Sequence, residues 1–298
     1  MPDLWLQPSP TPKDAGFRQD AHFVWCGSPI KVDDTYHLFA SRWPVDTGFP
    51  AGYMAHSEIV RATAGNPLGP YRYQETVLQE RNGYWDGNMT HNPTIHRVDN
   101  RFLLYYNGNA EPGGIRKVGY VFADSITGPW TRLDEPIPLS DDANNPAVLF
   151  DDKGSVLLAF RDRDLHMGIA TAPAHDGAYT VHGFDLFPDI KLEDMFLFRR
   201  EDGVHMICED NFAQISGHER WGVHLFSENG ITNWRKAEPL IAYDHRILWE
   251  DGTSVTATRR ERPQLLFDTA GRLTHLATSI LVDGHTWNHI QPVEFSNS

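Results

Sequence analysis

The sequence has few cysteines: only Cys26 and Cys208 occur among 298 residues, and neither belongs to a Cys-x-x-Cys pair. A framework of several disulfides is therefore excluded. One bridge between the two cysteines is an alternative, but two buried free thiols are the preferred interpretation. The 15 histidines form no His-Glu-x-x-His motif and no spaced Cys/His set, so we expect no metal site.

Long apolar segments and basic runs are also missing. No apolar stretch of ~18 residues occurs, and the N-terminus lacks a basic segment followed by an apolar one, so we expect a cytoplasmic protein without a membrane partner. The formal net charge of −14 would repel a phosphate backbone, which argues against nucleic acid. No glycine-rich phosphate-binding motif follows a strand, and we expect no cofactor. The oligomeric state stays open.

A repeated unit is present instead: polar residues before a Pro or Met, a short apolar strand, an Asp/Gly-type turn and a second apolar strand. Its clearest copies begin at His91-Asn92-Pro93 and Asn144-Asn145-Pro146. Turn residues between two apolar runs are typical of β-hairpins. Five copies occur, with the Pro or Met at positions 29, 93, 146, 195 and 263.

The spacing of these units fits propeller blades, which take ~40–50 residues plus loops. Helical periodicity is scarce. The sequence therefore predicts an all-β fold, a five-bladed β-propeller with a central channel, formed by residues 1–298 as one domain. A β-sandwich is the alternative, but it does not predict the same motif at the head of each unit.

In a propeller the first strand of each blade lines the channel, so the residues before these strands meet at one mouth. The strands that pair with them end in further polar residues. The expected pocket residues from the blade heads are Ser28, His91, Asn92, Asn144, Asn145, Glu193, Asp194, Glu261 and Arg262. Those from the paired strands are Arg42, Asn107, Arg161, Arg163, Glu209 and Asp210. Carboxylates, amides and guanidinium groups around one axis suit carbohydrate chemistry, because paired carboxylates supply acid and base or nucleophile.

The chain resembles the five-bladed propeller glycoside hydrolases, chiefly families 43 and 117, with a fainter likeness to families 32, 62 and 130. The likeness covers roughly residues 20 to 290. It depends on the repeated units and on outer strands of the type seen at Ala123-Asp124-Ser125-Ile126-Thr127-Gly128-Pro129-Trp130. The resemblance implies a glycosidase with its active site at the channel mouth.

Family 43 enzymes use an Asp base, an Asp that tunes a pKa, and a Glu acid at three blade heads. The residues of this chain that we expect to match these three positions are Ser28, Asn145 and Glu193, so the resemblance retains only the Glu acid. The resemblance thus implies a catalytic set of its own. The preferred general acid is Glu193 or Asp194, with Glu261 as its carboxylate partner.

Further candidates lie beside the heads. Asp86 is expected to reach the pocket rim, and the likeness to family 117, which allows a histidine acid, keeps His91, His218 and His245 as candidates. Trp43 and Trp85 are candidates for stacking on a sugar face, with packing between blades as the alternative. The predicted substrate-binding residues are Ser28, Arg42, Trp85, Asn92, Asn145, Arg161, Arg163, Asp210, His218 and Arg262.

The leading hypothesis is an exo-acting glycoside hydrolase on an oligosaccharide. A uronic acid or anhydro sugar is a candidate substrate unit, because Arg42, Arg161 or Arg262 would hold its anionic group. Three alternatives stay open: a phosphorylase like family 130, a carbon–oxygen lyase, and a sugar-binding propeller without catalysis. Phosphate dependence, an ultraviolet-absorbing product, or binding without turnover would distinguish them.

Overall fold

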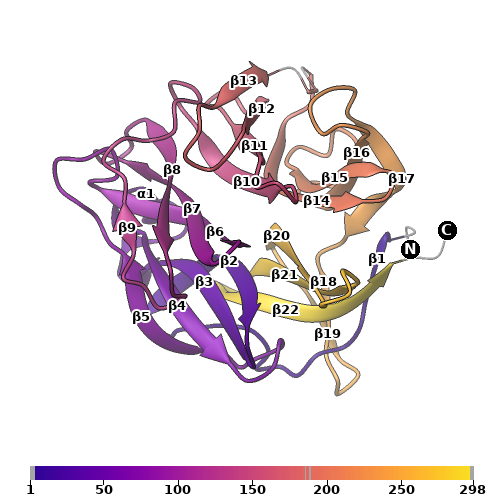
Figure 1. The fold of residues 1–298 in the computed structure, drawn as a ribbon. Helices are drawn as coiled ribbons and strands as arrows, with labels where there is room; N and C mark the ends of the chain where they lie inside the picture. The colour runs from indigo at the N-terminus through magenta and orange to yellow at the C-terminus, as the bar shows by residue number, and fades with distance from the viewer. Residues whose placement is uncertain (1–3, 185, 188, 296–298) are drawn as a thin grey trace.

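The computed structural model describes residues 4–184, 186–187 and 189–295. In this part of the chain, five four-stranded antiparallel sheets follow one another around a central channel (Figure 1). The predicted five-bladed β-propeller is therefore confirmed, whereas the assignment of residues 1–298 to one domain stays a prediction.

Blades 1 to 4 are meanders whose strands run outward from the channel in chain order. Blade 1 contains β2 (His22–Val32), β3 (Thr35–Pro44), β4 (Glu58–Ala64) and β5 (Arg72–Leu78). Blade 2 contains β6 (Met89–Val98), β7 (Arg101–Asn109), β8 (Arg116–Ala123) and β9 (Thr131–Arg132). Blade 3 contains β10 (Asn144–Phe150), β11 (Val156–Arg161), β12 (Met167–Ala172) and β13 (Thr180–Gly183). Blade 4 contains β14 (Leu192–Arg200), β15 (Gly203–Asp210), β16 (Gly222–Ser227) and β17 (Arg235–Tyr243).

Blade 5 is completed by the N-terminal segment. It contains β20 (Arg259–Phe267), β21 (Leu273–Val282) and β22 (His285–Phe295), and its outermost strand is β1 (Leu6–Pro8). Leu6 pairs with Phe295 in an antiparallel register. The two ends of the described chain therefore share one sheet, which fixes the last blade to the start of the sequence.

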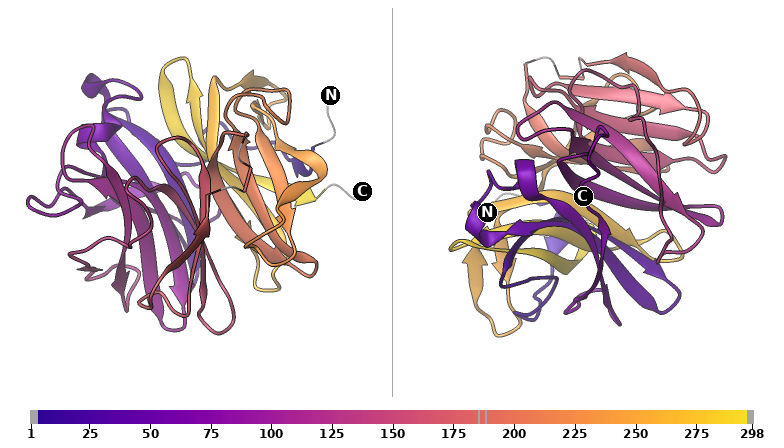
Figure 2. Two further views of the ribbon diagram at one scale, coloured as in Figure 1. Left: turned by 90° about the horizontal axis from the view of Figure 1, so that it is seen from above. Right: turned by 90° about the vertical axis from the view of Figure 1, so that its left-hand side faces the viewer.

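Apolar side chains between neighbouring blades hold the ring together. Leu103 of blade 2 and Phe160 of blade 3 belong to one buried cluster, and Val24 of blade 1 packs with Ile290 of blade 5 in another. Figure 2 shows the ring from two further sides. Because adjacent blades share no strand pairs among the residues that the structure describes, burial of these clusters, rather than a hydrogen-bonded ladder, fixes each blade against the next.

Two segments add to the blades at the channel mouth. The connection after β3 includes a short 3-10 helix, η1 (Val45–Thr47), and one turn of α-helix, α1 (Tyr53–His56). A two-stranded hairpin, β18 (Arg246–Leu248) and β19 (Ser254–Thr256), lies between blades 4 and 5 in the chain. None of the helices in the described ranges is long and apolar enough to pass through a membrane.

A bulge occurs at the same place in every innermost strand. The pairing register shifts between Trp25 and Ser28 in β2, and equivalent shifts occur in the other four inner strands. The central bulge residues are Cys26, Asn92, Asn145, Asp194 and Arg262, with φ of 55°, 54°, 52°, 57° and 56° respectively. Left-handed backbone is uncommon outside glycine, and bulges re-aim side chains. The chain thus turns polar groups toward the channel at five equivalent points.

Candidate active site

The five bulges surround a cavity of about 170 Å³ on the channel axis. Two side chains from each blade head line it. The first of each pair is Trp25, His91, Asn144, Glu193 or Glu261, and the second is the central bulge residue, Cys26, Asn92, Asn145, Asp194 or Arg262. The expected convergence of the blade heads on one pocket is thus present in the structure.

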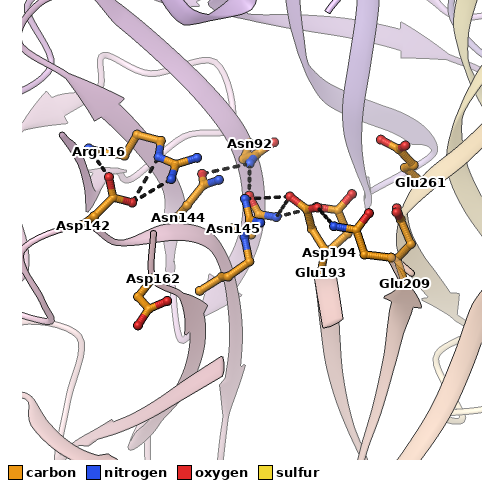
Figure 3. A network of polar contacts seen from close by, with 12 residues as sticks. Asn92, Arg116, Asp142, Asn144, Asn145, Asp162, Glu193, Asp194, Glu209 and Glu261 are labelled. Carbon is orange, nitrogen blue, oxygen red and sulfur yellow. Dashed lines mark hydrogen bonds and ion pairs between the residues drawn. The ribbon is translucent and has the colours of Figure 1, made fainter. Parts of the chain in front are cut away.

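Four of the five central bulge residues form a chain of hydrogen bonds, and Figure 3 shows the part of it that links Asn92, Asn145 and Asp194. The Cys26 thiol donates to Asn92 Oδ1 at 2.6 Å, and Asn92 Nδ2 donates to Asn145 Oδ1 at 2.6 Å. Asn145 Nδ2 in turn donates to Asp194 Oδ1 at 2.6 Å. Each amide is fixed by donating and accepting at once, so the Asp194 carboxylate is held in one orientation.

Three buried carboxyl groups lie together on one side of this chain. Single oxygens of Asp194, Glu209 and Glu261 are all within 4.8 Å of one another. Burial raises the pKa of Glu261 to about 7, and the nearby Asp194 charge adds to this. Burial also raises the pKa of Asp194 to about 6, while Arg262 opposes the shift. The pKa of Glu209 is raised as well, by burial and then by Glu261.

Arg220 compensates two of these carboxyl groups. Its Nη1 lies 2.8 Å from Glu209 Oε1 and 2.7 Å from Glu261 Oε1. Three clustered carboxylate oxygens are suitable metal ligands, but here the guanidinium already takes the place between two of them. The cluster therefore has a charge partner within the chain.

Glu193 has a different environment from the other carboxylates. Its Oε1 lies 2.7 Å from Arg161 Nη2 and accepts from Asn145 Nδ2 at 3.3 Å, and its Oε2 accepts from Asn211 Nδ2 at 2.9 Å. Both oxygens thus accept hydrogen bonds, the arrangement that an ionised carboxylate forms.

Arg262 is a buried guanidinium whose donors are unused. The residue is 2% exposed, and Nε, Nη1 and Nη2 have no hydrogen-bond partner among the residues that the structure describes. The nearest carboxylate oxygen, Asp194 Oδ1, is 3.6 Å from Nη1. Since this side chain lines the cavity, its unused donors are available to a ligand there.

His91 is held neutral in the cavity wall. Burial lowers its pKa to about 3, and Arg262 and Arg116 act in the same direction. Its Nδ1 lies 2.7 Å from Ser57 Oγ, and its ring stacks on Tyr53 with centroids 4.6 Å apart. A neutral imidazole can hydrogen-bond a sugar hydroxyl, but it has no excess proton to donate near neutral pH.

Aromatic side chains form one wall of the cavity, on the blade 1 side. Trp25 and Phe49 lie edge to face at 5.0 Å between centroids, and Trp43 stacks on Phe49 at 5.8 Å. Tyr53 and Pro50 complete this wall. A polar floor with an aromatic wall is the combination that binds the polar edges and apolar faces of a sugar ring.

The structure separates the predicted site residues into two groups. Of the residues predicted to be catalytic or substrate-binding, seven line the cavity: Glu193, Asp194, Glu261, His91, Asn92, Asn145 and Arg262; the expected pocket residue Asn144 and the stacking candidate Trp43 line it as well. Eight do not: Asp86, Ser28, Arg42, Trp85, Arg161, Arg163, Asp210 and His218. Of the second group, only Arg161 contacts a cavity carboxylate directly, through its ion pair with Glu193.

Most residues of the second group have structural partners elsewhere. Asp86 is fully buried and accepts from Tyr106 and Arg132, so it does not reach the rim. Arg42 pairs with Glu58, and Trp85 stacks on Tyr106 in the core between blades 1 and 2.

The last three residues of that group lie at a strand end or in loops. Asp210 is the last residue of β15, and it accepts from the backbone N–H groups of residues 214–216 and so fixes the loop that follows. Arg163 is an exposed side chain near Asp142, and His218 stacks on Trp221.

The prediction for blade 1 is displaced by two residues. The register shifts in blades 1 and 2 show that Cys26 and Gly27, not Ser28 and Pro29, are at the positions equivalent to Asn92 and Pro93. Ser28 instead donates to Gln264 and accepts from the Ile95 N–H, between blades. The blade 1 residue at the position equivalent to Asn92, Asn145, Asp194 and Arg262 is therefore the buried thiol Cys26.

No protein-family model matches the sequence, and no curated protein matches it either. Solved structures do match. An endo-arabinase from Bacteroides thetaiotaomicron aligns over 95% of this chain and 99% of its own, with a TM-score of 0.68 and 13% identity. A family 117 glycoside hydrolase from the marine bacterium Zobellia galactanivorans aligns over 97% and 89%, with a TM-score of 0.69 and 16% identity.

An α-L-arabinofuranosidase from Podospora anserina, solved in complex with cellotriose, aligns over 99% of this chain and 98% of its own, with a TM-score of 0.67 and 13% identity. At these identities the likeness establishes the fold. The chain therefore has the five-bladed propeller of the family 43 and 117 glycoside hydrolases, as the resemblance implied.

Proposed function

We propose that this protein is a glycoside hydrolase whose axial cavity binds the terminal sugar of an oligosaccharide. The observation that carries the proposal is the pair of buried carboxyl groups in the cavity, Asp194 and Glu261, with raised pKa values of about 6 and 7. Two carboxyl groups of unequal acidity beside one sugar are what glycosidic cleavage requires. The likeness to propeller glycosidases supports the same reaction.

In the proposed reaction Glu261 protonates the leaving-group oxygen as its bond to the anomeric carbon breaks. One oxygen of Asp194 lies within 4.8 Å of one oxygen of Glu261, a separation that suits double displacement, so the ionised Asp194 bonds to the anomeric carbon as the leaving group departs. Water then displaces Asp194 from that carbon and gives its proton to the Glu261 carboxylate. These roles differ from the sequence prediction, which named Glu193 or Asp194 as the acid and Glu261 as the partner. The higher pKa of Glu261 favours it as the donor, while Glu193 forms an ion pair with Arg161 and accepts two hydrogen bonds from fixed partners.

The size of the cavity favours exo action. A volume of about 170 Å³ is close to that of cavities of ~150 Å³ that hold one six-membered ring, and is far below the ~300–1,000 Å³ of larger ligand sites. One terminal sugar unit is thus the expected occupant. The cytoplasmic location stays a prediction from the sequence.

The test is turnover of a panel of aryl glycosides and oligosaccharides with free, reduced and blocked ends, each with and without inorganic phosphate. We expect release of terminal sugar units without a phosphate requirement. A strict phosphate requirement would indicate a phosphorylase, and an unsaturated product that absorbs in the ultraviolet would indicate a lyase. Binding of sugars without any turnover would favour the non-catalytic propeller.

The reaction is expected to have a bell-shaped pH dependence. Asp194 must be ionised, so kcat/KM falls as the pH drops below about 6. Glu261 must be protonated, so kcat/KM also falls as the pH rises above about 7. The two apparent values belong to the interacting pair. A profile without an alkaline limb would contradict the role of Glu261.

An anionic sugar unit is the substrate that we propose, because Arg262 has unused donors in the cavity. Arg42 and Arg161 are already paired with Glu58 and Glu193. Replacing Arg262 by Met is expected to lower kcat/KM about 10- to 100-fold for a uronic acid glycoside and less for its neutral counterpart. Arg262→Lys, which keeps the charge, is the matched control. An equal loss for both substrates would contradict recognition of an anion.

A further inference from the structure

A second hollow lies beside the axial cavity at the same mouth of the propeller. Its volume is about 470 Å³, larger than the cavity itself. It lies between the start of β2 and the turn that joins β21 to β22, with Trp249 from the β18–β19 turn on one side. We define the outer groove as the hollow bounded by Phe23, Val45, Trp249, His285 and Trp287.

The outer groove and the axial cavity share an aromatic boundary. Phe23 lines the groove and Phe49 lines the cavity, and the two rings lie edge to face with centroids 5.4 Å apart. Phe23 also packs against Trp43 of the cavity wall at 5.8 Å. The two hollows are therefore separated by the packed rings of Phe23 and Phe49, and a sugar chain that extends from the cavity past Phe49 reaches the groove directly beyond them.

The chemistry of the groove suits a sugar. Trp287 is 6% exposed and belongs to a buried apolar cluster, so its indole forms part of the apolar floor of the groove. Arg18 lies over the same indole at 4.7 Å and lines the groove with Asp20 and Asp283. Indole surfaces surrounded by donors and acceptors bind the faces and hydroxyls of sugar rings.

The hairpin that contributes Trp249 is not needed to complete any blade. Each blade already has four strands, and β18 and β19 form a separate two-stranded sheet, to which Thr11 of the N-terminal segment adds by donating its N–H to the Leu248 carbonyl. Trp249 and Trp287 belong to one apolar cluster, so the hairpin is packed against blade 5 rather than extended into solvent. The fold thus positions an additional tryptophan beside the cavity without a structural requirement from the ring.

We propose that the outer groove is a second carbohydrate subsite, which binds the sugar units on the leaving-group side of the bond while the terminal unit occupies the axial cavity. This inference depends on the proposed function. It makes the substrate an oligosaccharide chain rather than a simple glycoside, and it predicts that affinity increases with chain length.

The test is to fill the groove without disturbing the core. Val45 is 43% exposed, so Val45→Trp is expected to fold normally and to obstruct the groove. We expect KM for a tri- or tetrasaccharide to rise about tenfold, while kcat and KM for an aryl glycoside of the terminal sugar stay unchanged. Phe267→Trp, at the far end of β20, is the control for adding an exposed indole. Equal KM values for Val45→Trp and wild type on the long substrates would overturn the proposal.

The proposed function and the subsite fail in different ways. If the wild-type protein cleaves no glycoside, the proposed function fails, and the subsite is then tested by calorimetric titration with the uncleaved oligosaccharides. Binding that is lost in Val45→Trp and kept in Phe267→Trp supports a sugar subsite in the groove. Binding that both variants retain, or absence of binding to the wild type, overturns it.

Discussion

Replacement of Glu261 by Gln is expected to lower kcat by about 10²- to 10⁴-fold on any glycoside that the protein cleaves. Gln keeps the size of the side chain but cannot give a proton to the leaving group. The carboxyl group of Glu261 is buried in the cavity wall, and its pKa of about 7 leaves about half of it protonated at neutral pH. Steady-state kinetics with the best substrate of the panel measure the effect.

A glycoside whose released phenol has a low pKa provides an internal check on the role of Glu261 as the acid. Because such a leaving group needs little protonation, the loss of kcat in Glu261→Gln is expected to be smaller for a nitrophenyl glycoside than for an oligosaccharide. Glu219→Gln is the matched control, since this side chain is 72% exposed. An almost unchanged kcat for Glu261→Gln, or an equal loss for both leaving groups, would remove Glu261 from the role of acid.

Replacement of Arg220 by Met is expected to destabilise the protein in a strongly pH-dependent manner. Arg220 forms ion pairs with Glu209 and Glu261, and both of these carboxyl groups are buried. Without it the pKa values of both carboxyl groups rise further, so the folded state binds more protons than the unfolded state up to a higher pH. The free energy of unfolding therefore falls as the pH increases. At pH 8 we expect a loss of about 3–5 kcal/mol, as for other broken buried ion pairs.

Urea unfolding of the wild type and the variant at pH 5 and pH 8 measures this difference. At pH 5 the two carboxyl groups are largely neutral, so only a small part of the loss is expected there. Arg235→Met is the control, because Arg235 is 64% exposed and lies 3.7 Å from an exposed Glu228. A loss of equal size at both pH values would contradict the charge compensation that we assign to Arg220.

Four of the five blade heads could be predicted from the sequence because each carries a visible signal. Proline or methionine follows the central bulge residue in blades 2 to 5, and apolar strands follow at regular intervals. Blade 1 has Gly27 at the equivalent position, and the nearby Pro29 misled the prediction by two residues. The bulge itself, which fixes the position of Cys26, has no sequence signature of its own.

The missed cavity residues come mainly from long connections and from strand ends. Phe49 and Tyr53 belong to the connection after β3, and Arg220 precedes β16. The sequence prediction names His218, two residues before Arg220, and not Arg220 itself. Loop conformation decides which of these two side chains faces the channel, and in this loop the Arg220 N–H donates to the Asp210 carbonyl. Burial also decides that the pKa of Glu261 is higher than the pKa of Asp194, and the sequence does not specify burial.

The most direct test of the central claim is hydrolysis in water enriched with ¹⁸O, followed by mass spectrometry of the released sugar. If the axial cavity is the site of a glycoside hydrolase, the product of the wild-type protein gains one ¹⁸O atom at the anomeric carbon, and product release is nearly lost in Glu261→Gln. A sugar phosphate, an unsaturated sugar without the label, or labelled product at the same rate from Glu261→Gln would contradict it.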